Sequence, residues 1–311
     1  MRARDRSRGR ELDTALVEFN RQIRPLPGIN NPARREALVE QLIESIRRIR
    51  YIEVIQNQRI SELRADGASD LFDPLRAAVL RREEGELDDA FWLVFLSVHF
   101  GKHRRAGWRL AGDVYGCLGG RRPWNWERIS NDPAGFRRWI GDHQEDLKRG
   151  GVVYFGNHRK YETLKPESQR GTASVVESYV RWVGLPRMHI ELVEEGVGEI
   201  GDDPRELFDY LYRSMNVISF GRMAKFDYLT MLGKLGLARI EPGTPYLHGA
   251  TGPLKGARLL FDPNHGAPLR EEVLDGRVVE LGNHLHVGMQ VMEDALCNWQ
   301  KYPNRFVPFR G

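Results

Sequence analysis

The sequence predicts a mainly α-helical protein. Apolar residues recur at helical spacing over most of the 311 residues, most clearly in segment 33–65, where leucines and isoleucines lie three or four positions apart. Candidate strands are confined to three short runs, at residues 152–155, 190–193 and 278–281. With 41% hydrophobic and 29% charged residues, the chain is able to bury a large core, in one domain or in two coupled ones.

The N-terminal part is predicted to be a helical layer at residues 11–85, preceded by a flexible basic arm at residues 1–10. The arm reads MRARDRSRGR and lacks the apolar run of a secretory signal, so it either contacts phosphate or is merely solvated. The first helix is expected at residues 11–25. A charged break, RREEGELDD at residues 81–89, separates this layer from the larger domain at residues 86–311.

The larger domain is predicted to consist of helices joined by turns rich in glycine and proline. Asn131-Asp132-Pro133 has the composition of a helix start, because aspartate caps N–H groups and proline suits the first turn. The helices outside segment 221–261 are expected at residues 90–102, 108–117, 133–149, 172–185, 204–215 and 286–301.

The segment Gly221–Phe261 is predicted to form a helix, a hairpin and a second helix. Gly252-Pro253 opens the second helix, which carries Lys255 and Arg258, and the hairpin contains His248. Helix N-termini and loop amides present N–H donors without intrahelical partners, and these groups bind phosphate well. The segment therefore predicts a binding site for the phosphate backbone of a nucleic acid.

Composition limits the cellular setting and the cofactors. Cys117 and Cys297 form no CxxC pair, so neither a zinc site of cysteines nor a disulfide framework is supported. Lys and Arg number 47 against 43 Asp and Glu, and the formal net charge of +4 favours a polyanionic partner. No apolar run reaches membrane-spanning length. We expect a cytoplasmic protein without a metal or other cofactor and without membrane contact.

A first polar cluster follows the apolar run at residues 152–155. It contains an amide, an imidazole, two cations, a phenol and a carboxylate, a density typical of a site for a polar ligand. The carboxylate can act as a general base, the cations suit phosphate and the phenol can stack on a base. A solvated loop with one aromatic anchor is the alternative. The cluster is Asn157, His158, Arg159, Lys160, Tyr161 and Glu162.

A second cluster ends the apolar helix at residues 90–102, with Lys102, His103 and Arg104 as candidate phosphate contacts. Cations at a helix C-terminus are also favoured by the helix dipole alone. His99 lies on the apolar face, where a hydrogen-bonded core histidine is the favoured interpretation. His99 and His103 share a face, but no carboxylate accompanies them, so we predict no metal site there.

The C-terminal helix offers Asp294 on its inward stripe, where desolvation would raise the basicity of the carboxylate. The alternative is that Asp294 caps the helix or pairs with an arginine. Most of the seven tryptophans are expected in the core. Trp124 and Trp126 follow Arg121-Arg122-Pro123 in a loop, where stacking on an unpaired base is the competing interpretation.

Five motifs together resemble the alpha-glutamyl/putrescinyl thymine pyrophosphorylase family, clade 3. They are HFGKHRRAGW, FGNHRKYETL, SFGRMAKFDYL, TGPLKGARLLF and MQVMEDALCNWQK, and the resemblance runs from about Asp88 to Phe309, leaving the first 80 or so residues outside. It implies a helical enzyme, distantly similar to helix-hairpin-helix DNA glycosylases, that acts on hypermodified bases in DNA. The hairpin here is longer than in those enzymes, and Asn283 stands where they carry an aspartate.

Three functions are compatible with these observations. The main hypothesis is a DNA glycosylase of phage defence that flips out and excises a hypermodified pyrimidine, leaving an abasic site. The alternative is a transferase in which an amine displaces pyrophosphate from an activated hydroxymethylpyrimidine in DNA. A non-catalytic module that binds modified DNA is the third.

The residues assigned to this function fall into three groups. The catalytic candidates are the carboxylates Glu162, Asp227 and Asp294. The base-pocket candidates are Asn157, His158, Tyr161 and Arg222. The DNA-binding candidates are Lys102, His103, Arg104, Lys160, His248, Lys255 and Arg258.

Overall fold

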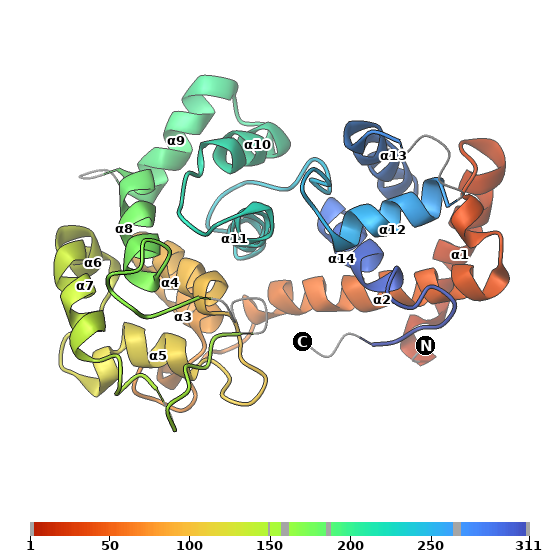
Figure 1. Ribbon diagram of the computed structural model, residues 1–311. Coiled ribbons are helices and arrows are strands. Elements are labelled where there is room, and N and C mark those ends of the chain that lie inside the picture. The colour runs from red at the N-terminus through yellow and green to blue at the C-terminus, as the bar shows by residue number, and fades with distance from the viewer. Residues whose placement is uncertain (1–2, 149, 157–161, 185–187, 264–268, 309–311) are drawn as a thin grey trace. The chain divides into compact units, whose positions relative to one another are not determined.

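Helices joined by turns and loops make up the computed structural model, which describes residues 3–148, 150–156, 162–184, 188–263 and 269–308 (Figure 1). These residues form fourteen α-helices and four short 3₁₀ helices, and no strand. The predicted mainly α class is confirmed. No described helix combines the length and the apolar composition needed to cross a bilayer.

The chain divides into two compact units. Unit 1 joins the two ends of the chain, Met1–Ile52 and Pro242–Arg310, and unit 2 is the continuous stretch Glu53–Glu241. The boundary predicted at residue 85 falls inside unit 2, where Gly85, with a φ of +84°, makes a tight turn between two packed helices. A charged surface turn and a domain linker have similar compositions, so the charge run alone does not distinguish them.

Unit 1 is built around a close crossing of α12 with α14. A Cβ atom on Gly256 would lie 2.3 Å from the carbonyl oxygen of Leu296, so only glycine permits this approach. Apolar side chains from both ends of the chain surround the crossing, and Leu16, Phe19 and Leu260 are fully buried there. The α-helices of unit 1 are α1 (Arg6–Gln22), most of α2 (Pro32–Ile55), α12 (Gly252–Phe261), α13 (Glu271–His284) and α14 (Met289–Trp299), and its 3₁₀ helices are η1 (Ala3–Asp5) and η2 (Pro27–Ile29).

Residues 6–10 form the first turns of α1, which differs from the flexible arm predicted for them. Arg8 donates a hydrogen bond to the carbonyl oxygen of Leu285 at 3.0 Å, and Arg47 donates to Asp5 at 3.1 Å. Arginine has high helix propensity, and these partners lie far away along the chain. Composition near the terminus therefore gave no indication of the anchoring.

Unit 2 surrounds one apolar helix, α4 (Leu87–Phe100). Its residues from Asp89 to Phe100 are all buried, as expected for a helix that is apolar on every side. The other helices of unit 2 are η3 (Glu62–Arg64), α3 (Pro74–Glu83), α5 (Arg109–Tyr115), η4 (Cys117–Gly119), α6 (Trp126–Asn131), α7 (Pro133–Asp142), α8 (Thr172–Val183), α9 (His189–Ile200), α10 (Pro204–Ser214) and α11 (Arg222–Lys234).

Three helices of unit 2 begin with an aspartate-proline pair, Asp73-Pro74, Asp132-Pro133 and Asp203-Pro204. In each pair the aspartate carboxylate accepts hydrogen bonds from N–H groups of the first turn, and the proline occupies a position that needs no N–H donor. The helix start predicted at Asn131-Asp132-Pro133 is confirmed, with the Asp132 carboxylate 2.7 Å from the Gly135 nitrogen.

We expect Asp132→Ala to lower the free energy of unfolding by about 1 kcal/mol, because a first-turn N–H loses its side-chain acceptor. Asp132→Asn keeps an acceptor oxygen and should retain most of this stability. Urea denaturation of the two variants measures the difference. Equal losses for both would contradict a capping role.

The three predicted strands are not formed. Residues 190–193 lie in α9 and residues 278–281 in α13, and residues 152–155 form no strand. At the start of α9 the Glu191 carboxylate accepts the backbone N–H of Met188 at 2.7 Å, which favours the helix. Short apolar runs suit buried helices as well as strands, so periodicity alone did not separate the two.

The predicted helix-hairpin-helix segment contains both helices but belongs to two units. α11 ends at Lys234 and α12 begins at Gly252. The division between the units follows Glu241, in the link between these helices, so α11 belongs to unit 2 and α12 to unit 1. The two helices are confirmed, whereas the compact two-helix motif stays a prediction.

Candidate functional site

Two glycine-containing motifs meet at the end of α4. The ring of Phe155 stacks on that of Phe100 with centroids 5.8 Å apart, and the N–H of Gly156 donates to the carbonyl oxygen of Phe100 at 2.7 Å. Gly101 has a φ of +65°, and a Cβ atom on Gly156 would lie 2.7 Å from its carbonyl carbon. The backbones cross so closely that both positions require glycine.

His99 lies in the interior of unit 2, beside these two motifs. It is 1% exposed, its ring lies parallel to that of Phe95 at 6.0 Å, and it meets Phe155 edge to face at 6.1 Å. Its Nε2 atom lies 3.0 Å from Oγ1 of Thr172, the first residue of α8. The predicted core histidine is confirmed, and it ties the end of α4 to the start of α8.

The third motif reaches the same place before α11. Phe220 stacks on Phe95 with centroids 4.9 Å apart. The N–H of Ile218 donates to Ser178 of α8 at 2.9 Å, and the Ser219 hydroxyl donates to the Arg170 carbonyl oxygen at 3.4 Å. Three of the five resemblance motifs therefore converge around α4 and α8. We call Phe95, His99, Phe100, Phe155 and Phe220 the Phe-Gly cluster, after the three Phe-Gly pairs that it joins.

Glu162 adjoins this cluster. The residue after it, Thr163, accepts the backbone N–H of Thr172 through its carbonyl oxygen at 2.8 Å, and Leu164 is buried. Glu162 itself is half-buried, and it directly precedes Thr163, whose carbonyl oxygen makes this contact with α8. The other members of the polar cluster, Asn157, His158, Lys160 and Tyr161 among them, lie outside the described residues.

Arg222 and Asp227 lie five residues apart on α11. Both are half-buried, and the Arg222 guanidinium lies 5.1 Å from the centroid of the Phe226 ring. Arg222 directly follows the Phe220-Gly221 pair, so it begins α11 beside the Phe-Gly cluster. A guanidinium at this position is suited to an anionic group, whereas Asp227 lies about 140° further round the helix, so the two side chains leave α11 on different faces.

The three predicted DNA contacts after α4, Lys102, His103 and Arg104, differ in their surroundings. Lys102 and Arg104 are exposed. The Nδ1 atom of His103 accepts the backbone N–H groups of Arg105 and Ala106 at 3.2 and 3.1 Å. His103 therefore shapes a turn, whereas Lys102 and Arg104 have cationic groups available to a ligand.

The third candidate carboxylate, Asp294, belongs to unit 1, so no single unit contains all three. It accepts the Ser45 hydroxyl at 2.6 Å and the Asn298 amide at 3.0 Å, and it forms an ion pair with Arg48. This is the arginine pairing named as the alternative in the sequence analysis. The catalytic assignment of Asp294 stays a prediction.

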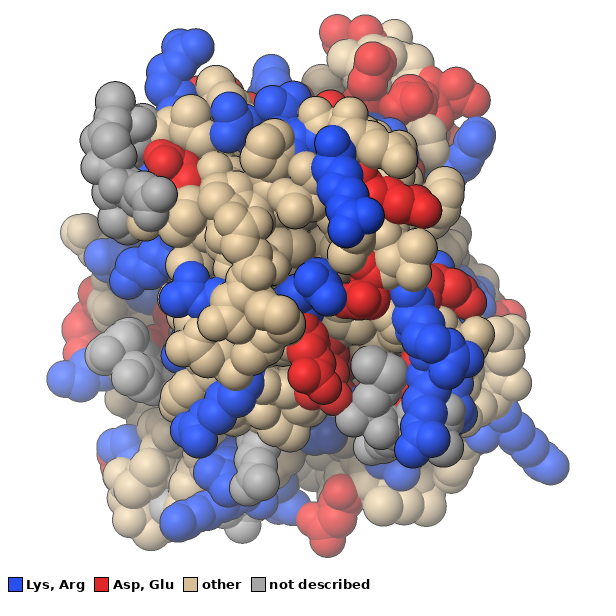
Figure 2. Space-filling model, turned by 90° about the vertical axis from the view of Figure 1, so that its right-hand side faces the viewer, with Lys and Arg blue, Asp and Glu red and all other residues tan. Residues whose placement is uncertain are grey.

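The remaining described DNA-binding candidates lie on α12 or just before it, in unit 1: His248, Lys255 and Arg258. Lys255 is exposed on α12. His248 and Arg258 share one acidic partner, Glu271 of α13, at 2.9 and 3.9 Å. Figure 2 shows basic side chains in several separate groups with acidic side chains between them, as a net charge of only +4 implies.

Trp124 and Trp126, predicted as possible stacking platforms, are buried instead, at 2% and 7% exposure. The Arg128 guanidinium covers the Trp124 ring at 3.6 Å, and Trp126 packs on His189 at 4.3 Å. These rings join the core because α6 and α7 fold the loop back onto α4. The stacking interpretation is therefore wrong for both residues.

A buried chain of hydrogen bonds in unit 2 was not predicted. The ring Nδ1–H and the backbone N–H of His189 both reach Asp88, at 2.5 and 2.7 Å. His189 Nε2 lies 2.7 Å from the Tyr179 hydroxyl, which lies 2.8 Å from that of Tyr228. The four residues come from α4, α9, α8 and α11 and are far apart in sequence, so no local pattern could reveal them.

Burial and hydrogen bonding set the protonation of this chain. Burial lowers the pKa of His189 more than Asp88 raises it, so the imidazole is neutral at pH 7. Burial alone would raise the pKa of Asp88, but the hydrogen bonds from His189 outweigh it and lower the pKa. Nδ1–H of His189 then donates to Asp88, and Nε2 accepts the hydroxyl of Tyr179, which accepts that of Tyr228.

The described residues contain no group of three or more His, Cys, Asp or Glu side chains arranged to hold a metal ion. His99 and His103, which share a helix face in the sequence, have different partners, Thr172 and two backbone N–H groups. The polar groups at the site are carboxylates and cations, which suit acid-base chemistry and anion binding.

Comparison with known proteins gives one result. The family model of alpha-glutamyl/putrescinyl thymine pyrophosphorylase clade 3 matches residues 33–311. No curated protein and no solved structure matches the chain. The match begins in α2, so the expectation that the first 80 or so residues lie outside the resemblance is wrong; the five motifs marked only its more distinctive part. The chain belongs to the alpha-glutamyl/putrescinyl thymine pyrophosphorylase family, clade 3.

Proposed function

We propose that this protein is a transferase that attaches an amine to a pyrophosphorylated hydroxymethylpyrimidine in DNA and releases pyrophosphate. The observation that carries the proposal is the family match over residues 33–311, because the family name specifies a modified thymine and pyrophosphate chemistry. This was the alternative function in the sequence analysis, and the family match favours it over the glycosylase.

The reaction is a displacement at the exocyclic methylene carbon of the base. The amine nitrogen forms a bond to that carbon, the carbon–oxygen bond to pyrophosphate breaks, and pyrophosphate leaves with the electron pair. The attacking amine loses one proton. The enzyme must therefore supply a base for the proton and cations for the leaving group.

Unit 2 offers residues for both tasks beside the Phe-Gly cluster. Glu162 is our candidate for the base, since it directly precedes Thr163, which is hydrogen-bonded to the start of α8, and is half-buried. Arg222 is our candidate for the pyrophosphate, with Lys160 of the sequence-predicted cluster. Asp227 is the second candidate carboxylate. Lys255 of unit 1 stays a candidate contact for a DNA phosphate.

An oligonucleotide that carries one pyrophosphorylated 5-hydroxymethyluracil tests the reaction, with putrescine or glutamate as the amine. The proposal predicts pyrophosphate release that requires the amine, and DNA that has lost its pyrophosphate group and gained the amine in its place, as mass spectrometry would show. Free base together with abasic sites would identify the glycosylase instead. Binding of modified DNA without either product would identify the non-catalytic module.

A further inference from the structure

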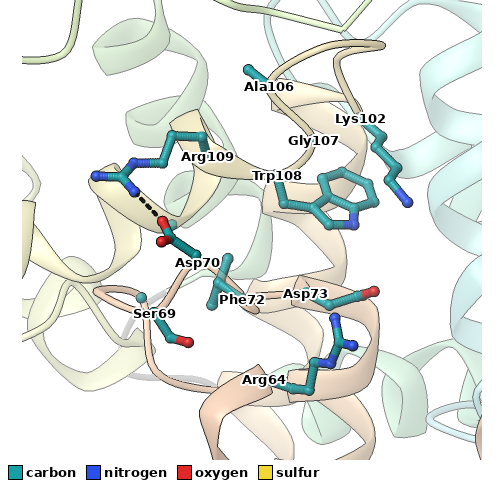
Figure 3. A pocket seen from close by; sticks show the side chains of 12 residues that line it. Arg64, Ser69, Asp70, Phe72, Asp73, Lys102, Ala106, Gly107, Trp108 and Arg109 are labelled. Carbon is teal, nitrogen blue, oxygen red and sulfur yellow. Dashed lines mark hydrogen bonds and ion pairs between the residues drawn. The ribbon is translucent and has the colours of Figure 1, made fainter.

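A cavity of about 410 Å³ opens in unit 2 between the segment before α3 and the turn after α4. Figure 3 shows Trp108 on its wall, Lys102 beside the indole ring, and Arg64 near Asp73 on the opposite side. Its volume lies within the roughly 300–1,000 Å³ typical of small-molecule sites. Neither the Phe-Gly cluster nor the proposed reaction accounts for this cavity.

Trp108 is held in a fixed position. It is half-buried and precedes α5, and the turn before it is closed by two backbone hydrogen bonds between His103 and Gly107, at 2.9 and 2.8 Å. Gly107 has a φ of +59°, which favours glycine. The ammonium nitrogen of Lys102 lies 6.0 Å from the centroid of the Trp108 ring. An aromatic wall with an adjacent cation therefore exists before any ligand binds.

The charges around the cavity leave an excess of cations. Asp70 forms an ion pair with Arg109 at 2.7 Å, and Asp73 forms one with Arg76 at 2.5 Å. Within the described residues, neither Lys102 nor Arg64 has a carboxylate oxygen within 4.0 Å; the Arg64 guanidinium donates to the Leu71 carbonyl oxygen at 3.0 Å. An anionic ligand with a planar group thus fits the cavity better than a cationic one.

We propose that this cavity binds one nucleotide of the DNA strand, with the base against Trp108 and a phosphate between Lys102 and Arg64. The inference rests on the proposed function, which supplies DNA as the partner. The backbone of Gly101 and Lys102 is in close contact with Gly156, so the cavity adjoins the Phe155-Gly156 pair of the Phe-Gly cluster. Base–aromatic stacking and phosphate contacts are the usual elements of single-strand binding.

Fluorescence anisotropy with a labelled oligothymidylate of about ten nucleotides tests the proposal on the full chain. Trp108→Leu should weaken binding at least about fivefold, the lower limit expected for loss of one stacked base. Trp108→Tyr keeps an aromatic face and should restore most of the affinity. Lys102→Gln should reduce the slope of log K against log salt by about 0.7.

Arg213→Gln is the matched control, because Arg213 is a highly exposed cation of unit 2 outside the cavity, paired with Asp209 at 2.7 Å. It should change the affinity less than twofold. Thermal melting of each variant separates lost binding from lost folding, and Trp108→Tyr and Lys102→Gln decide the case if Trp108→Leu unfolds. If thymidine monophosphate competes as strongly as the unlabelled oligonucleotide, the ligand of the cavity is a free nucleotide and the proposal of a DNA strand is wrong.

Equal affinities of the wild-type protein and Trp108→Leu, or no binding of the oligonucleotide by the wild-type protein, would overturn the proposal. The transferase proposal is tested separately, by pyrophosphate release. If binding depends on Trp108 but no pyrophosphate is released, the transferase is wrong and the nucleotide site stands. If Trp108→Leu binds the oligonucleotide and releases pyrophosphate as well as the wild-type protein does, the nucleotide site is wrong and the transferase proposal stands.

Discussion

Glu162→Gln is expected to reduce amine-dependent pyrophosphate release by a factor of about 10² to 10⁴, the range for loss of a general base. Glutamine has the same shape but cannot accept the proton of the attacking amine. Because the DNA and pyrophosphate contacts are unchanged, the loss should appear in kcat rather than in KM. Single-turnover assays with the modified oligonucleotide, at saturating amine, measure this rate.

Glu167→Gln is the matched control. Glu167 lies five residues later in the same loop and is exposed, so its neutralisation should leave the rate within twofold. The same assay applied to Asp227→Asn discriminates between the two carboxylates. A normal rate in Glu162→Gln together with a large loss in Asp227→Asn would transfer the role of base to α11.

Helix content and helix starts were predictable from the sequence because they depend on neighbouring residues. Asp132 and Pro133 determine the start of α7 through groups within one turn. The two-unit organisation depends instead on contacts between distant segments. The crossing of α12 and α14 requires Gly256 beside the Leu296 carbonyl, 40 positions apart in sequence. No periodicity in either helix identifies its partner.

The candidate site was likewise predictable from the sequence only in part. Its motifs were recognisable in the sequence because Phe155-Gly156 and Phe220-Gly221 each precede a dense group of polar residues. Their convergence on α4 follows from ring stacking and from a backbone crossing that a single sequence does not reveal. For Trp124 the sequence left open a place in the core or stacking on an unpaired base, because its burial depends on partners further along the chain: the rings of Phe136 and Trp139 lie 5.3 and 6.0 Å away, and Arg128 covers it at 3.6 Å.

Removing Asp88 is expected to destabilise the protein by about 2–3 kcal/mol. Asp88→Ala leaves two buried donors of His189, the ring Nδ1–H and the backbone N–H, without their acceptor, and each such loss costs about 1–3 kcal/mol. Asp202→Ala is the control, since Asp202 has 83% of its side chain exposed and its contact with Arg239 is a long one, at 3.4 Å. Its effect should stay within about 0.5 kcal/mol. Urea unfolding at pH 7 measures both.

The same network predicts how stability depends on pH. Burial depresses the pKa of His189 below 6.5 in the folded protein, whereas the unfolded imidazole titrates near that value. As pH falls through 6.5, the unfolded state binds a proton that the folded state does not, so stability decreases, by at most about 1.4 kcal/mol per pH unit. The depressed pKa of Asp88 contributes stability above pH 3.8, and this is lost as pH falls further.

His189→Asn isolates this contribution, because the amide still donates to Asp88 but does not titrate. Other groups that titrate in the same range are shared by both proteins and cancel in the difference. Between pH 7 and pH 5 the wild-type protein should therefore lose more stability than the variant. Equal losses would mean that the folded imidazole takes up its proton as readily as the unfolded one. Asp88 and His189 would then form a buried ion pair at low pH, and the order of donors through Tyr179 to Tyr228 would have to be reversed.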